Sequence, residues 1–123
     1  MKTILLIEDD PFLVEIYTTK LKGAGYKVNM ANNTEDALRK TREAKPDLVV
    51  LDIVLPKLDG WEFLKAIRQD SQFKDLKVVI LSNLGQKEEI DKGFGLGVIK
   101  YFIKAEHTPS EVMDEIKEIL DAD

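Results

Sequence analysis

Two hydrophobic patterns alternate along the chain. Short, mostly apolar runs occupy residues 3–7, 48–51, 77–81 and 98–103, and residues 26–31 alternate apolar with polar side chains. The runs predict strands buried on both faces of a parallel sheet, and the alternating segment predicts a partly covered edge strand. Between the strands, apolar residues recur every three or four positions, as in helices packed on one side. We therefore expect a single domain over residues 1–123 with five strands and five helices, a doubly wound α/β fold.

Local signals place the helix starts and the turns. Capping residues and prolines predict helix starts at Pro11, at Asn33 or Thr34, and at Thr108. Apolar spacing predicts two further helices, over residues 61–69 and 86–94. Asp10 and Asp59 are interpreted as cap or loop acids, and residues 57–60 as a loop with turn chemistry. The fourth helix, residues 86–94, has glycines at and beyond its end, so we expect it to be the most mobile.

Charge and composition exclude several classes of function. The net charge is −5 and no basic run is present, which argues against direct nucleic-acid binding. No apolar stretch is long enough to span a membrane, and the first strand leaves no room for a signal peptide. Cysteine is absent and His107 is the single histidine, so disulfides, thiolate chemistry and a histidine-based triad are disfavoured. We expect a cytoplasmic protein.

Polar side chains follow four of the predicted strands. They are Glu8 with Asp9, then Asp52, Ser82 and Lys104. Because parallel strands bring their carboxyl ends to one edge of the sheet, these groups should converge there. Three carboxylates repel one another and need a cation, and oxygen ligands favour Mg²⁺ or Mn²⁺. A hydroxyl and an ammonium group beside that metal would suit an anion with tetrahedral oxygens, and an aspartate can form an acyl phosphate.

On these residues the sequence resembles the receiver domain of two-component response regulators. The resemblance covers nearly the whole chain and is carried by residues 4–11, 51–52 with 55–60, 80–82 and 97–104. It implies a flavodoxin-like fold with the strand order 2-1-3-4-5. It also implies a signalling module that catalyses only its own phosphorylation and dephosphorylation, rather than an enzyme with an external substrate.

The resemblance assigns a role to each polar residue. Asp52 would be the phosphoacceptor, and Ser82 and Lys104 would bind the phosphoryl oxygens. Magnesium, or manganese in its place, would be held by Glu8, Asp9, Asp52 and the backbone carbonyl of Val54.

The same resemblance implies partners and an output. The phosphodonor would be a phosphohistidine on a sensor histidine kinase or a histidine phosphotransfer protein. After transfer, Ser82 would follow the phosphate and Tyr101 would change rotamer. These movements would shift the surface made by the fourth helix, the last strand and the last helix. The downstream protein is unknown; we expect a monomer, and whether phosphorylation drives dimerisation stays open.

Two departures from the family pattern carry predictions. Lys104 is followed by Ala105 where relatives usually have proline, so a trans bond is expected, since a cis bond there would cost about 2.5–4 kcal/mol. Val54 and Leu84 stand where many relatives have polar groups that meet the hydrolytic water. Neither side chain can hydrogen-bond to that water, so we expect slow dephosphorylation.

Three alternatives remain open. A phosphohydrolase of the haloacid-dehalogenase kind would also use an aspartate nucleophile, but it needs a second aspartate where this chain has Val54. A structural module could bind its partner without phosphorylation. A receiver that is part of a longer transcriptional regulator would have the same sequence pattern.

Overall fold

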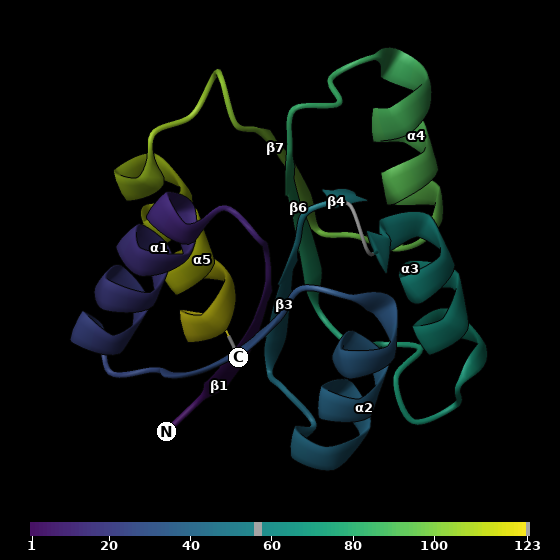
Figure 1. Cartoon of the computed structure of the whole chain (residues 1–123), viewed down its shortest axis with the longest axis horizontal. Helices are drawn as coiled ribbons and strands as arrows, with labels where there is room; N and C mark the ends of the chain where they lie inside the picture. The colour runs from purple at the N-terminus through teal and green to yellow at the C-terminus, as the bar shows by residue number, and fades with distance from the viewer. Residues whose placement is uncertain (56–57, 123) are drawn as a thin grey trace.

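A five-stranded parallel sheet forms the centre of the computed structural model, which describes residues 1–55 and 58–122 (Figure 1). The strands are β1 (Thr3–Ile7), β2 (Lys27–Ala31), β3 (Leu48–Leu51), β6 (Val78–Ser82) and β7 (Lys100–Ile103). They lie side by side in the order β2-β1-β3-β6-β7. Counted along these five strands, that is the expected order 2-1-3-4-5, with β2 at an edge as its alternating pattern predicted.

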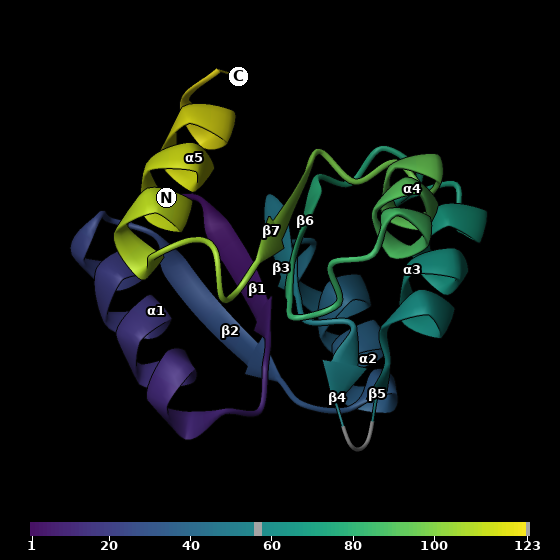
Figure 2. The ribbon, with the colours of Figure 1, turned by 90° about the horizontal axis from the view of Figure 1, so that it is seen from above.

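Helices cover both faces of the sheet. They are α1 (Pro11–Gly23), α2 (Thr34–Ala44), α3 (Gly60–Gln69), α4 (Lys87–Gly95) and α5 (Pro109–Asp121). Figure 2 shows α1 and α5 on one face and α2, α3 and α4 on the other. The expected five helices and doubly wound architecture are thus confirmed. Among the described residues, no helix combines the length and the apolar character needed to cross a membrane.

Alternate side chains of each central strand enter opposite cores. In β1, Leu5 and Ile7 pack with the core under α2 and α3, whereas Ile4 and Leu6 pack with the core under α1 and α5. The unbroken apolar run of β3 divides in the same way. Burial on both faces explains why these strands lack the polar alternation of a half-exposed sheet.

Side-chain caps fix the helix starts where the sequence predicted them. Asp10, Asn33 and Asp59 each accept hydrogen bonds from backbone N–H groups in the first turn of α1, α2 and α3. Thr108 and Glu111 form the expected capping box of α5. In contrast, the residue before α4, Gln86, makes no side-chain cap hydrogen bond.

Two local features differ from the sequence prediction. A short antiparallel hairpin of β4 (Val54–Leu55) and β5 (Leu58–Asp59) replaces part of the expected loop; Pro56 and Lys57 lie outside the described residues. The last strand begins at Lys100 rather than at residue 98, because the Val98 N–H donates to the end of α4 at Gly93. The Lys104–Ala105 bond is trans, as expected, since no described peptide bond is cis.

The start of α3 lies against the segment that follows Asp52. The Gly60 N–H donates to the Ile53 carbonyl at 3.2 Å. A Cβ atom built on Gly60 would lie 2.6 Å from the Ile53 Cα, a backbone atom that cannot move aside easily. Only glycine therefore allows this close approach.

We predict that Gly60→Ala lowers the free energy of unfolding by about 1–3 kcal/mol, the usual cost of overpacking. Chemical denaturation measures this change. Gly23→Ala is the matched control, since an added Cβ there meets nothing within 4 Å, and it should leave the stability unchanged or slightly higher. Equal stability of the two variants would contradict the tight contact at Gly60.

Candidate functional site

The strand register brings the polar residues to one edge of the sheet. Ile7, Leu51 and Ile80 are neighbours across β1, β3 and β6, so the residues that follow them emerge together. The Asp52 N–H donates to the Ile7 carbonyl at 3.0 Å, immediately before Glu8 in the chain. Across β6 and β7, the Lys104 N–H donates to the Ser82 carbonyl at 2.9 Å.

Lys104 bridges two carboxylates at this edge. Its Nζ lies 2.7 Å from Asp52 Oδ2, to which it donates a hydrogen bond, and 2.7 Å from Glu8 Oε1. The side chains of Glu8 and Asp52 are 2% and 8% exposed, so water screens these charges little. Although burial lowers the pKa of Lys104, its contacts with Asp52 and Glu8 outweigh that effect and raise the pKa above its usual value.

Glu8 is buried, and its two carboxylate oxygens have different partners. Its Oε2 accepts hydrogen bonds from the backbone N–H groups of Asp9 and Asp10 at 3.0 and 3.3 Å. Its Oε1 is buried beside the Lys104 ammonium group, with which it forms an ion pair at 2.7 Å. Burial raises the pKa of Glu8, and the nearby Asp52 charge adds to this, while Lys104 opposes it.

The remaining groups form the wall of an open pocket of about 340 Å³. Asp52 Oδ1 accepts a hydrogen bond from the Val54 N–H at 3.1 Å, and Ser82 Oγ accepts one from the Leu84 N–H at 3.3 Å. These bonds orient the carboxylate and the hydroxyl. The pocket is lined by Glu8, Asp9, Asp10, Asp52, Val54, Ser82, Asn83, Leu84 and Lys104.

The donor set suits a hard divalent cation, although it does not form a closed metal site. Glu8, Asp9 and Asp52 all line this pocket, and their carboxylates offer oxygen ligands only. Within residues 1–55 and 58–122, no three acidic or histidine side chains are grouped as a metal cluster. Asp9 is exposed, and Lys104 occupies the position between Glu8 and Asp52. The ammonium group therefore supplies the positive charge for both buried acids here.

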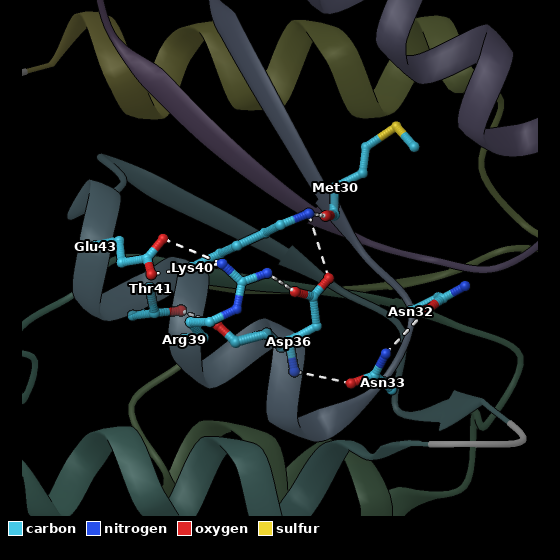
Figure 3. A network of polar contacts seen from close by, with 9 residues as sticks. Met30, Asn32, Asn33, Asp36, Arg39, Lys40, Thr41 and Glu43 are labelled. Carbon is cyan, nitrogen blue, oxygen red and sulfur yellow. Dashed lines mark hydrogen bonds and ion pairs between the residues drawn. The ribbon is translucent and has the colours of Figure 1, made fainter.

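An additional acid near this edge, Asp36, is already neutralised. It lines a neighbouring pocket with Glu8 and Asp9. Figure 3 shows its carboxylate between Arg39 and Lys40, with ion pairs to both. Burial raises the pKa of Asp36, but hydrogen bonds from Lys40 and Arg39 outweigh it and leave the pKa below the usual value. Asp36 is thus paired with two cations on its own helix.

The backbone of Leu84 connects Ser82 to Tyr101. Its N–H donates to Ser82 Oγ, and its carbonyl accepts a hydrogen bond from the Tyr101 hydroxyl. Burial, followed by the nearby charges of Glu89 and Asp52, raises the pKa of Tyr101. The sequence could not reveal this connection, because it runs through peptide groups rather than through a characteristic side chain.

We predict that Glu8→Gln raises the free energy of unfolding at pH 7 in metal-free buffer. The folded-state pKa of Glu8 lies above its unfolded value, so its charge destabilises the fold increasingly as the pH rises through that range. The advantage of the variant should therefore shrink as the pH falls toward 4. Denaturation at a series of pH values tests this, with Glu118→Gln, an exposed acid on α5, as control. A variant less stable than the parent at pH 7 would contradict the prediction.

Comparison with known proteins agrees with this geometry. Residues 4–117 match the response regulator receiver domain. The chain is 40% identical over 121 residues to the alkaline phosphatase synthesis transcriptional regulatory protein PhoP of Bacillus subtilis, covering 97% of this chain and 48% of that protein. It spans about half the length of the relatives it matches.

Solved structures show the same fold. The non-phosphorylated HemR receiver domain from Leptospira biflexa superposes with a TM-score of 0.89 at 29% identity, covering 97% of this chain and 94% of that one. The Mn²⁺-bound form of response regulator Rcp1 has a TM-score of 0.81 at 25% identity, covering 97% and 91%. Receiver domains bind divalent metal and work with histidine kinases in two-component signalling. The sequence, the fold and the convergent polar edge together show that this chain belongs to the response regulator receiver domain family.

Proposed function

We propose that this domain accepts a phosphoryl group on Asp52 from a phosphohistidine and thereby switches a protein-interaction surface. One observation supports this most strongly: Lys104 joins Asp52 and Glu8 at 2.7 Å in the pocket that also contains Ser82. A carboxylate, a hydroxyl and an ammonium group around one cavity match the needs of phosphoryl transfer, which depends on positioning and charge neutralisation. We expect the domain to act in the cytoplasm, with a sensor histidine kinase or a phosphotransfer protein as donor.

A divalent cation would complete the charge balance of this site. Glu8, Asp9, Asp52 and the Val54 carbonyl are the groups we expect to hold Mg²⁺ or Mn²⁺. When bound, the ion would neutralise negative charge on the transferring phosphoryl group. Glu8 and Asp9 both line the pocket with carboxylate oxygens, and Asp9 is exposed there.

With a divalent cation bound, the residues of this pocket supply the remaining groups that the transfer needs. A carboxylate oxygen of Asp52 forms the new O–P bond while the P–N bond of the donor phosphohistidine breaks. The leaving imidazole keeps the electron pair and gains a proton from solvent. Lys104 holds the carboxylate before transfer and can bind a phosphoryl oxygen afterwards, and Ser82 Oγ can bind another. The product is an aspartyl phosphate.

The same residues suggest how the output surface responds. A phosphoryl group that draws in Ser82 Oγ would compete with its bond to the Leu84 N–H. The Leu84 carbonyl holds the Tyr101 hydroxyl, so movement of this peptide would reach β7 and the start of α4. We infer that Ser82 and Tyr101 are the switch residues. Binding experiments with the phosphorylated domain would identify the protein that contacts this surface. They would also show whether phosphorylation drives dimerisation.

A hydrolase acting on external substrates is less well supported. Such an enzyme would need an acid two residues beyond Asp52, and the residue there is Val54, an apolar side chain that is 58% exposed. The lengths of the relatives favour a second arrangement. The matched relatives include transcriptional regulators about twice as long as this chain, so the domain could control an attached DNA-binding part.

We predict that acetyl phosphate with Mg²⁺ adds one phosphoryl group to the protein, and that Asp52→Asn removes this reaction entirely. Intact mass under neutral conditions measures the adduct. EDTA should abolish it, because Lys104 alone does not neutralise the combined charge of the acids and the transferring phosphoryl group. Asp114→Asn, an exposed acid on α5, is the matched control and should react normally. Phosphorylation of the Asp52→Asn protein would refute the proposed acceptor.

We predict slow loss of the phosphoryl group, and faster loss in Val54→Asn. The amide could hold the attacking water, and one hydrogen bond worth about 1 kcal/mol corresponds to roughly a five-fold change in rate. Val54 is largely exposed, so the substitution should not disturb the fold. Decay of the phosphorylated protein after removal of the donor is followed by mass, with Val54→Leu as the apolar control. Equal decay in the Asn variant and the parent would contradict the role of this position.

A further inference from the structure

Arg68 connects three segments through backbone carbonyls. It lies in the last turn of α3, and its guanidinium donates to the end of α4 and to the turn before β6. The Nε–Leu96 bond is 2.7 Å, the Nη1–Leu76 bond 2.8 Å and the Nη2–Gly97 bond 3.2 Å. Two further bonds from Nη1 reach the carbonyls of Phe73 and Lys74. A planar group with five fixed donors suits such a set of acceptors, and a lysine ammonium could not replace it.

The C-terminal end of α4 is therefore held firmly. Leu96 follows the helix and Gly97 has a φ of 81°, a left-handed conformation that directs both carbonyls toward Arg68. Beyond them, the Ile99 N–H donates to Val78 in β6. One turn earlier, the Lys92 ammonium lies 4.6 Å from the centre of the Trp61 ring on α3. Each contact ties this end of the helix to α3 or to the sheet.

The N-terminal end of α4 has much weaker restraints. Gln86 makes no side-chain cap, and Gly85 precedes it. On the first turn, Glu89 has a buried Oε2 without a hydrogen-bond partner among the described residues. The loop before the helix contains Leu84, whose peptide groups bond to Ser82 and Tyr101. The weak end of the helix is thus the end that is connected to the pocket.

We propose that Arg68 is a positioning residue that anchors the C-terminal end of α4, so that phosphorylation swings the N-terminal end of this helix about Leu96 and Gly97. This inference rests on the proposed phosphorylation of Asp52. Residues 84–91 would move on phosphorylation, and residues 92–99 would form the pivot. Burial lowers the pKa of Arg68, with the nearby Asp75 charge opposing, as expected for a guanidinium withdrawn from water to hold carbonyls.

Hydrogen exchange measured by mass spectrometry tests this pivot. Exchange is compared in peptides covering residues 84–91 and 92–99, with and without Mg²⁺ and beryllofluoride as the phosphoryl mimic. In the parent protein, the mimic should change exchange in residues 84–91 by several-fold and leave residues 92–99 unchanged. A response of equal size in both peptides would overturn the proposal.

Variants at Arg68 separate anchoring from general stability. Arg68→Met keeps an apolar stem and removes all five donors, so exchange in residues 92–99 should rise about ten-fold or more and the mimic should now alter both peptides. Arg68→Lys should be intermediate, and Arg42→Ala, an exposed arginine on α2, should match the parent. A response still confined to residues 84–91 in Arg68→Met would overturn the proposal. Exchange in β1 and β3 reports whether Arg68→Met destabilises the whole fold. If exchange in these strands rises as much as in residues 92–99, the variant is not used, and the comparison of the two peptides in the parent protein tests the proposal.

Failure of the proposed function gives a different result. Intact mass shows whether beryllofluoride or acetyl phosphate adds to Asp52. If neither adds, phosphorylation is disproved while the resting proteins still test the anchor. In that case a preferential rise in residues 92–99 of Arg68→Met supports anchoring, and an equal rise in residues 84–91 overturns it.

Discussion

One ammonium group shared by two buried acids organises the polar edge of the sheet. Lys104, which follows the last strand, lies 2.7 Å from both Asp52 and Glu8, which follow the neighbouring interior strands β3 and β1. Removing charges from water is costly unless they are paired closely, and a lone buried carboxylate would shift its pKa instead. The parallel register of the strands brings their three ends to one edge of the sheet, so the ammonium group and the two carboxylates can come into contact.

This arrangement leaves the two buried acids only partly compensated. The pKa of Glu8 is raised because burial outweighs the help from Lys104. A protein selected only for stability would replace such a group with an apolar one. Because Glu8 is retained, this edge of the sheet carries a net negative charge. A divalent cation could neutralise that charge, alone or together with a phosphoryl group. Close backbone packing at Gly60 then holds the segment after Asp52 in place.

The sequence predicted the features that have a side-chain signature. Apolar runs ending in polar residues located β1 and β3 and the polar edge, and the capping box at Thr108 located α5. The sequence could not predict contacts made by backbone groups, or features that depend on the three-dimensional arrangement of residues. Two-residue strands such as β4 are too short to show periodicity, and an arginine in the last turn of a helix, here Arg68, looks like an ordinary partner of the helix dipole. That Lys104 bridges both acids in the resting domain required coordinates, since the sequence suggested only a phosphate ligand.

We expect Lys104 to exchange a carboxylate partner for a phosphoryl oxygen when Asp52 is phosphorylated. A crystal structure of the protein with Mg²⁺ and beryllofluoride tests this most directly. We expect beryllium bonded to a carboxylate oxygen of Asp52, with Lys104 Nζ and Ser82 Oγ each contacting a fluorine. A structure in which the mimic is absent from Asp52, or in which Lys104 still bridges Glu8 and Asp52 without touching it, would contradict the account.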